Sequence, residues 1–167
     1  MAQPVAVAAR AFEETLAELT EKGHLQLGDP AQLGRCAALL ALAGAAWEQH
    51  LGPLYDGGQA QAILGVGTRQ AVSDLARRGR LLALESESGR KLYPAFQFSS
   101  SGRPYPEIAR VLEAFGEKVE TPYTIASWLV SPQDLLDGET PVAWMRARRD
   151  PRPLVAAARR AAEALAR

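Results

Sequence analysis

A short polar helix with a basic flank carries the side chains best suited to chemistry in this 167-residue chain. In "LGVGTRQAVSDLARRGR", residues 64–80, apolar Ala71, Val72 and Leu75 form the expected packed back of the helix. Its front and the hairpin after it carry types that bind guanine, adenine and phosphate oxygens. The candidate DNA-contact residues are Thr68, Arg69, Gln70, Ser73, Arg77, Arg78, Arg80, Arg90 and Lys91.

This polar front has a simpler interpretation, a solvated helix face whose charges only keep the protein in solution. The basic hairpin directly after the helix favours DNA binding. Two features weigh against tight, sequence-specific binding by a single module. The spacing from Gly65 to Val72 is one residue longer than usual, and Asp74 places a negative charge where phosphate would be repelled.

Helix, turn, helix and hairpin is the order of a winged helix-turn-helix module. We expect helices over 59–64 and 68–78, strands over 80–85 and 90–96, and Gly79 as a left-handed helix end. Apolar periodicity and capping residues predict further helices over 4–22, 29–50, 104–116 and 121–132, and two that start at Thr140–Pro141 and Asp150–Pro151.

The expected fold class is therefore mainly α, a helical bundle with a central winged helix-turn-helix that carries a short two-stranded β-hairpin. Turn-forming glycine and proline residues between the periodic segments divide the chain into three regions. Residues 1–54 form an N-terminal helical region for self-association or core cover, 55–98 the winged module, and 99–167 a C-terminal helical region.

Charge is balanced over the whole chain, with 19 basic and 19 acidic side chains, but it is divided into blocks. Residues 57–94 hold six basic and three acidic side chains, and residues 140–167 hold seven arginines and two acids. The segments 1–56 and 95–139 each hold three basic and seven acidic side chains. This excludes a binder that is strongly basic throughout and leaves a local basic patch.

Little in the sequence supports catalysis or metal binding. Cys36 is the only cysteine, and the histidines His24 and His50 stand far apart. No apolar run approaches the roughly 20 residues of a membrane span, and the N-terminus carries acids where a signal peptide carries basic residues. We expect a cytoplasmic protein that is not an enzyme and that uses no cofactor or metal.

Two segments resemble the MbcA/ParS-type antitoxins, the Xre/MbcA/ParS toxin-binding family. They are "LGVGTRQAVSDLARRGRLLALESESGRKLYPAFQF" and "TPYTIASWLVSPQDLLDGETPVAWMRARRDPRPLVAAARRAA", and the resemblance covers about residues 55–165. It implies a type II antitoxin whose C-terminal region binds and blocks a RES-domain toxin that consumes NAD. It also implies binding of operator DNA, by which the antitoxin represses its own operon.

The C-terminal region contains the residues that this resemblance implies for toxin binding. Its arginines can pair with acids on a partner or occupy a phosphate-binding cleft, and the tryptophan and methionine can serve as anchors. Competing interpretations are a core position for the tryptophan and solvated arginines favoured near a helix C-terminus. The candidate toxin-binding residues are Trp144, Met145, Arg146, Arg148, Arg149, Arg152, Arg159 and Arg160.

Two functions remain open on the sequence. The first is the antitoxin with a RES-domain toxin as partner. The alternative is a stand-alone dimeric DNA-binding transcriptional regulator whose C-terminal helices only dimerise it. We expect a homodimer, because two recognition helices one DNA turn apart provide the binding that a single weak module lacks.

Overall fold

A computed structural model describes residues 3–21, 46–86, 88–116 and 121–165. The chain divides into two compact units, Met1–Gly44 and Ala45–Arg167. In the first unit the described element is helix α1 (Gln3–Glu21), which confirms the helix expected over 4–22. The helix expected over 29–50 lies largely outside the described residues, although 46–51 are helical. Among the described helices, none is long and apolar enough to span a membrane.

The second unit is mainly helical with a small antiparallel sheet, which confirms the expected fold class. Strands β1 (Leu54–Tyr55), β2 (Leu84–Glu85) and β3 (Lys91–Pro94) lie in the order β1-β3-β2. The expected hairpin is β2 and β3, paired in the register Glu85↔Lys91. Strand β1 adds a third strand where a boundary was expected, because Leu54 pairs with Pro94 from a distant part of the chain.

Capping side chains set the ends of the two helices of the helix-turn-helix, α3 (Gly57–Leu64) and α4 (Arg69–Arg77). Asp56 accepts hydrogen bonds from the N–H groups of Gly58 and Gln59, which starts α3 two residues earlier than expected. Thr68 caps α4 by accepting from the N–H of Ala71 at 3.1 Å. Gly79 has a φ of 64°, which confirms its left-handed position after α4.

Three of the four C-terminal helices start where the sequence predicts, and α5 starts two residues later than expected. They are α5 (Pro106–Phe115), α6 (Pro122–Val130), α7 (Pro141–Arg146) and α8 (Pro151–Leu165). A 3-10 turn at Ala95–Gln97 follows β3, and another at Asp134–Leu136 lies between α6 and α7. Thr121 and Thr140 each cap a helix with their side chains, and a proline occupies the first turn. Short-range capping therefore accounts for both starts.

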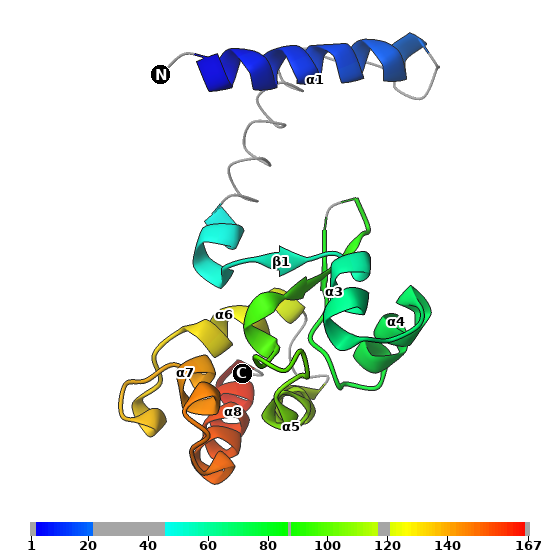
Figure 1. The fold of residues 1–167 in the computed structure, drawn as a ribbon. Coiled ribbons are helices and arrows are strands. Elements are labelled where there is room, and N and C mark those ends of the chain that lie inside the picture. The colour runs from blue at the N-terminus through cyan, green and yellow to red at the C-terminus, as the bar shows by residue number, and fades with distance from the viewer. Residues whose placement is uncertain (1–2, 22–45, 87, 117–120, 166–167) are drawn as a thin grey trace. The chain divides into compact units, whose positions relative to one another are not determined.

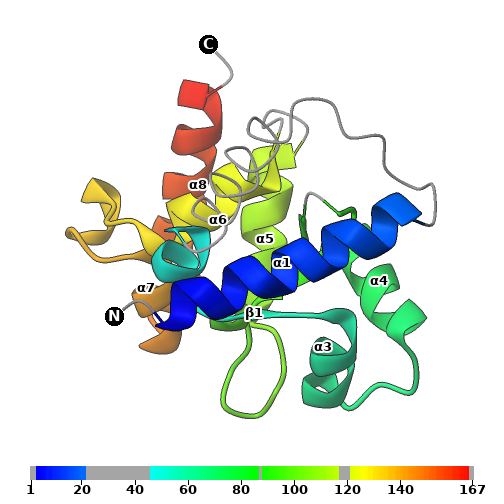
Figure 2. The ribbon, with the colours of Figure 1, turned by 90° about the horizontal axis from the view of Figure 1, so that it is seen from above.

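Two clusters of buried side chains hold the second unit together. The large cluster joins the buried faces of α5, α6, α7 and α8 to Leu51, Leu82, Leu84 and Phe96. The small cluster lies beneath α4 and consists of Ala60, Val72, Leu81 and Tyr93. Figure 1 and Figure 2 show α3 and α4 on one side of this unit, α7 and α8 on the other, and α5 between them. The winged part and the C-terminal helices thus share the large cluster.

Candidate nucleic-acid interface

Helix α4 presents an apolar back and a polar front. Val72 is fully buried, and Leu75 and Ala76 pack against the small cluster around it. The predicted contact residues from the same segment face the other way: Thr68, Arg69, Gln70 and Arg77 are exposed and Ser73 is half-buried. The structure therefore places these side chains where a ligand outside the protein can reach them.

Asp74 holds two of the front side chains together. Its Oδ1 accepts a hydrogen bond from Arg77 Nη2 at 2.8 Å and another from Gln70 Nε2 at 3.1 Å. The sequence interpretation treated this carboxylate only as a repulsive charge and missed the contacts. The signal was available, because side chains three and four residues apart on a helix are neighbours.

A hollow of about 500 Å³ lies beside α4. Gln70, Ser73 and Arg77 border it from α4, and Lys91 borders it from strand β3 of the wing. Apolar side chains of α5 and α6, among them Leu112 and Ile125, line its remaining wall. The tertiary structure thus brings four predicted residues from two separate elements to one concave surface.

Arg69, the first residue of α4, does not border this hollow, and its side chain lies beside the first residues of α3. Its Nη2 would be 3.3 Å from a Cβ atom added to Gly58. The pKa of the nearby Asp56 carboxyl is lowered, chiefly by the backbone N–H of Gln59, then by that of Gly58, and further by attraction to Arg69 and Arg90. The positive charge of these two arginines is therefore partly offset by a carboxylate.

Three more predicted arginines flank the front of α4. Arg78 is the C-cap of α4, Arg80 follows Gly79, and Arg90 lies in the wing, where its Nε donates to Ser88 Oγ at 3.3 Å. All three arginines are exposed. Within the described part of the chain none of them forms an ion pair, so the charges of Arg78 and Arg80 remain available to phosphate oxygens and that of Arg90 is only partly offset by Asp56.

Gln97 supports the interface from inside, and the sequence interpretation did not identify it. This fully buried side chain accepts from Leu82 N at 2.8 Å and donates to Leu82 O at 3.0 Å and Pro94 O at 3.1 Å. It occupies both backbone groups of Leu82 in the segment 80–83, where a strand was expected, and β2 begins only at Leu84. The contact fixes the link between α4 and the wing.

Two of the candidate toxin-binding residues lie in the core. Trp144 is 8% exposed and Met145 is 2% exposed, and both belong to the large cluster. Trp144 Nε1 donates to Asp150 O at 2.8 Å, and the Arg149 guanidinium covers the ring at 4.7 Å from its centroid. Because these side chains already fill the core, we leave Trp144 and Met145 out of the partner surface proposed below.

Among the candidate arginines of α7, α8 and the turn between them, Arg152 and Arg159 border one groove and the others lie apart from it. Arg149 pairs with Glu139 at 2.6 Å, and Arg148 is exposed with a φ of 52°. Arg152 pairs with Asp150 at 2.6 Å, a contact that raises the pKa of Arg152 and lowers that of Asp150. Separate hollows of about 550 and 270 Å³ are bordered by Arg146 and Arg160.

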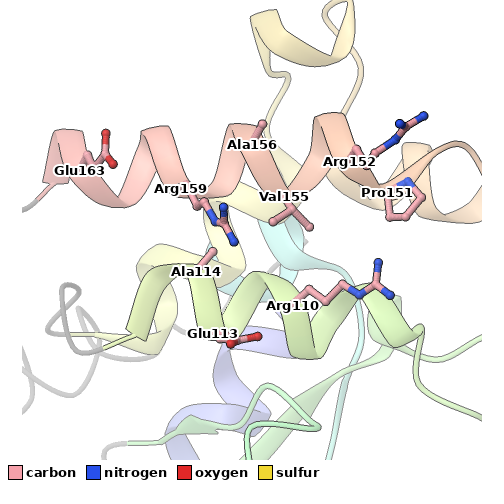
Figure 3. Close-up of a pocket in the computed structure, with 9 residues that line it drawn as sticks. All are labelled: Arg110, Glu113, Ala114, Pro151, Arg152, Val155, Ala156, Arg159 and Glu163. Atoms are coloured by element: carbon pink, nitrogen blue, oxygen red, sulfur yellow. The ribbon is translucent and has the colours of Figure 1, made fainter.

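Arg152 and Arg159 lie on a groove between α5 and α8, called here the α5–α8 groove, with a volume of about 680 Å³. Glu113 and Glu163 also border this groove. Arg110 of α5, which the sequence interpretation missed, lines the same groove, and Val155 and Ala114 supply apolar surface. Figure 3 shows Arg110 and Arg159 directed from opposite helices into the space between them. Neither arginine forms an ion pair with any residue that the structure describes.

We find no candidate metal site in the described residues. Among them, no group of three histidine, cysteine, aspartate or glutamate side chains is placed to hold a metal ion.

Comparisons with known proteins bear on the fold. No family model matches the chain, and no curated protein matches it. Among solved structures the chain is similar to the NMR structure of Rv2175c, with a TM-score of 0.56 and 25% sequence identity. The match covers 66% of this chain and 81% of that one. It supports the mainly helical fold with a small sheet and assigns no partner.

Proposed function

We propose that this protein binds duplex DNA through helix α4 and the β2–β3 wing. The observation that carries the proposal is the hollow beside α4, where Gln70, Ser73 and Arg77 face the same space as Lys91 of the wing. A recognition helix with its N-terminal part in the major groove is the usual docking of a helix-turn-helix module. The neighbouring hairpin then reaches the phosphate backbone.

The proposed contacts divide by chemistry. Gln70 and Arg77 have the donors and acceptors for adenine and guanine edges. Arg78, Arg80 and Lys91 are exposed cations for phosphate oxygens. Phosphate contacts release counterions, so affinity falls as salt rises, with a slope of about 0.9 per contact on logarithmic axes.

Fluorescence anisotropy with the full chain and a labelled duplex of mixed sequence tests this function across a range of salt concentrations. We expect Arg80→Ala to weaken binding to every sequence and to lower the salt slope by about 1. The matched control is Arg160→Ala, which removes the same charge from α8 and should leave the slope unchanged. Affinity that does not fall with salt, or equal losses in both variants, contradicts the proposal.

We also propose that the DNA-binding form is a homodimer. One small module with a carboxylate on its recognition helix supplies few contacts, and a second copy doubles them at a half-site one helical turn away. Light scattering of the full chain, free and with duplex, measures the stoichiometry. A single monomer on each bound duplex contradicts this part of the proposal.

A second candidate function is that of a type II antitoxin, and the α5–α8 groove favours it. We propose that Arg110 and Arg159 bind acidic groups of a RES-domain toxin, an enzyme that consumes NAD. The support is the pair of guanidinium groups, which form no ion pair in the described part of the chain, and the resemblance of residues 55–165 to MbcA/ParS-type antitoxins. DNA binding by α4 would then let the complex repress its own operon.

Co-purification with the product of the adjacent gene, followed by an NAD-consumption assay, tests this second function. We expect a stable complex that suppresses NAD loss, and Arg110→Glu/Arg159→Glu should weaken it by introducing like-charge repulsion. Arg10→Glu/Arg103→Glu is the control, because it makes the same change of charge at two exposed arginines outside the groove. If no complex forms, the antitoxin function is contradicted and the stand-alone regulator remains. If the double variant binds the toxin as tightly as the wild type, the toxin does not bind at the α5–α8 groove.

A further inference from the structure

We infer that Asp74 is a positioning residue that gives α4 its base selectivity. The inference rests on the proposed DNA-binding function and names the part of the interface that would distinguish one sequence from another. Its basis is the shared oxygen: Asp74 Oδ1 accepts from both Gln70 Nε2 and Arg77 Nη2. No other residue on α4 joins two of the predicted base-contacting side chains.

The three side chains lie in one row on the exposed face of α4. Their spacing of four and three residues brings successive members over adjacent helical turns. The same row borders the hollow next to Lys91 of the wing. Asp74 therefore lies inside the surface that a duplex would cover and cannot act only at its margin.

The hydrogen bonds to Asp74 leave the base-contacting groups free. Gln70 uses one amide hydrogen and keeps the other, together with Oε1, which is the pair that adenine requires. Arg77 uses one of its five N–H groups and keeps enough for a two-point contact with guanine. Asp74 thus fixes both side chains without consuming the atoms that would contact the bases.

Two effects of Asp74 on binding have opposite signs. Its charge repels phosphate whatever the sequence, so it lowers affinity for all duplexes. Its hydrogen bonds order two mobile side chains before binding, so less conformational freedom is lost when the correct bases are met. Removing Asp74 should therefore raise general affinity and lower selectivity, a combination that loss of folding would not produce.

Three variants of the full chain separate these effects. Asp74→Ala removes both the charge and the acceptor, whereas Asp74→Asn removes the charge and keeps an oxygen that can accept from both partners. Glu85→Gln is the matched control, because it removes a carboxylate charge from wing strand β2 and leaves α4 unchanged. The wild-type chain first selects its preferred site from a randomised duplex pool. Affinities for that site and for a scrambled duplex are then measured at a low and a high salt concentration, and the variants are compared at the lower one.

We expect all three variants to bind the scrambled duplex about two- to fivefold more tightly than the wild type. The ratio of preferred to scrambled affinity should fall about tenfold in Asp74→Ala and stay close to the wild-type value in Asp74→Asn and Glu85→Gln. A wild-type ratio in Asp74→Ala overturns the inference, as does an equal loss in Glu85→Gln. A wild-type chain with no salt-dependent binding overturns the proposed function itself.

Discussion

Helices α4 and α8 both direct arginines to solvent, but they rest on cores of very different size. Helix α4 packs on the small cluster around Val72, whereas α8 buries Leu154, Ala158 and Ala162 in the large cluster. Polar groups supplement the smaller core, with Thr68 capping α4 and Gln97 holding the segment that follows it. The position of α4 and of the candidate DNA interface therefore depends on hydrogen bonds more than the position of α8 does.

The two regions also treat buried polar groups differently. Gln97, beside the winged module, has partners for both its amide oxygen and its nitrogen. The indole N–H of Trp128, in the large cluster, is buried and has no hydrogen-bond partner among the residues that the structure describes. An unpaired buried donor forfeits its interaction with water, so the Trp128 N–H costs stability in a way that the Gln97 amide does not.

The largest effect is expected from Phe115→Ala in the large cluster. Phe115 is fully buried and meets Trp128 edge-on, with ring centroids 5.2 Å apart. Its truncation should lower the free energy of unfolding by about 3–5 kcal/mol. Because Leu82 and Leu84 belong to the same cluster, the winged part should unfold in the same transition, as measured by urea titration with circular dichroism and tryptophan fluorescence.

The control is Phe12→Ala in α1, where the ring is 42% exposed. It should change that transition by less than about 0.5 kcal/mol. Two separate transitions for the Phe115 variant would show that the winged part does not depend on the shared core.

The next effect concerns the hydrogen bonds beside α4. Gln97→Leu keeps the side-chain volume but leaves Leu82 N, Leu82 O and Pro94 O without their partner. We expect a loss of about 2–4 kcal/mol, because each buried group left unpaired costs about 1–3 kcal/mol and relaxation recovers part. Hydrogen exchange at the Leu82 amide should accelerate.

Gln61→Leu provides the comparison, since Gln61 donates a single hydrogen bond to Gly67 O at the protein surface. A Gln97 variant no less stable than the Gln61 variant would show that apolar packing alone holds the link between α4 and the wing.

We expect only a small effect on stability from Trp128→Phe, which removes a polar group that is unpaired among the described residues and leaves no other described group without its partner. The change removes a buried N–H that has no partner in the described part of the chain, and also some packing volume, so stability should stay within about 1 kcal/mol of the wild type. Trp144→Phe is the matched control, because its Nε1 donates to Asp150 O at 2.8 Å. It should be the more destabilising of the two in thermal unfolding, and equal losses would contradict this account.

The smallest effect is the pH dependence of the α3 cap. The pKa of Asp56 is lowered below its usual 3.8 by the N–H groups of Gln59 and Gly58. The folded state therefore favours the carboxylate, and this stabilisation is complete above the unfolded pKa and lost as pH falls through the folded one. Asp56→Asn keeps an acceptor and should flatten the melting temperature across that acidic range. An unchanged acid profile would mean that the cap does not titrate.

The sequence by itself determined the features that depend on neighbouring residues. Threonines before Ala71, Tyr123 and Ala143 predicted three helix starts, and a glycine after Arg78 predicted a helix end. The apolar back and polar front of α4 also follow from the order of its residues. These features are readable because the interactions that create them join residues within four positions of each other.

Only the tertiary structure decided which distant residues meet. The chain path pairs Leu54 with Pro94, places Gln97 against Leu82 and sets Arg110 opposite Arg159. It also buries Trp144, a residue type that serves equally well in a core or on a partner surface. No local pattern encodes these outcomes, because each depends on how whole helices pack and on which side chains are left outside.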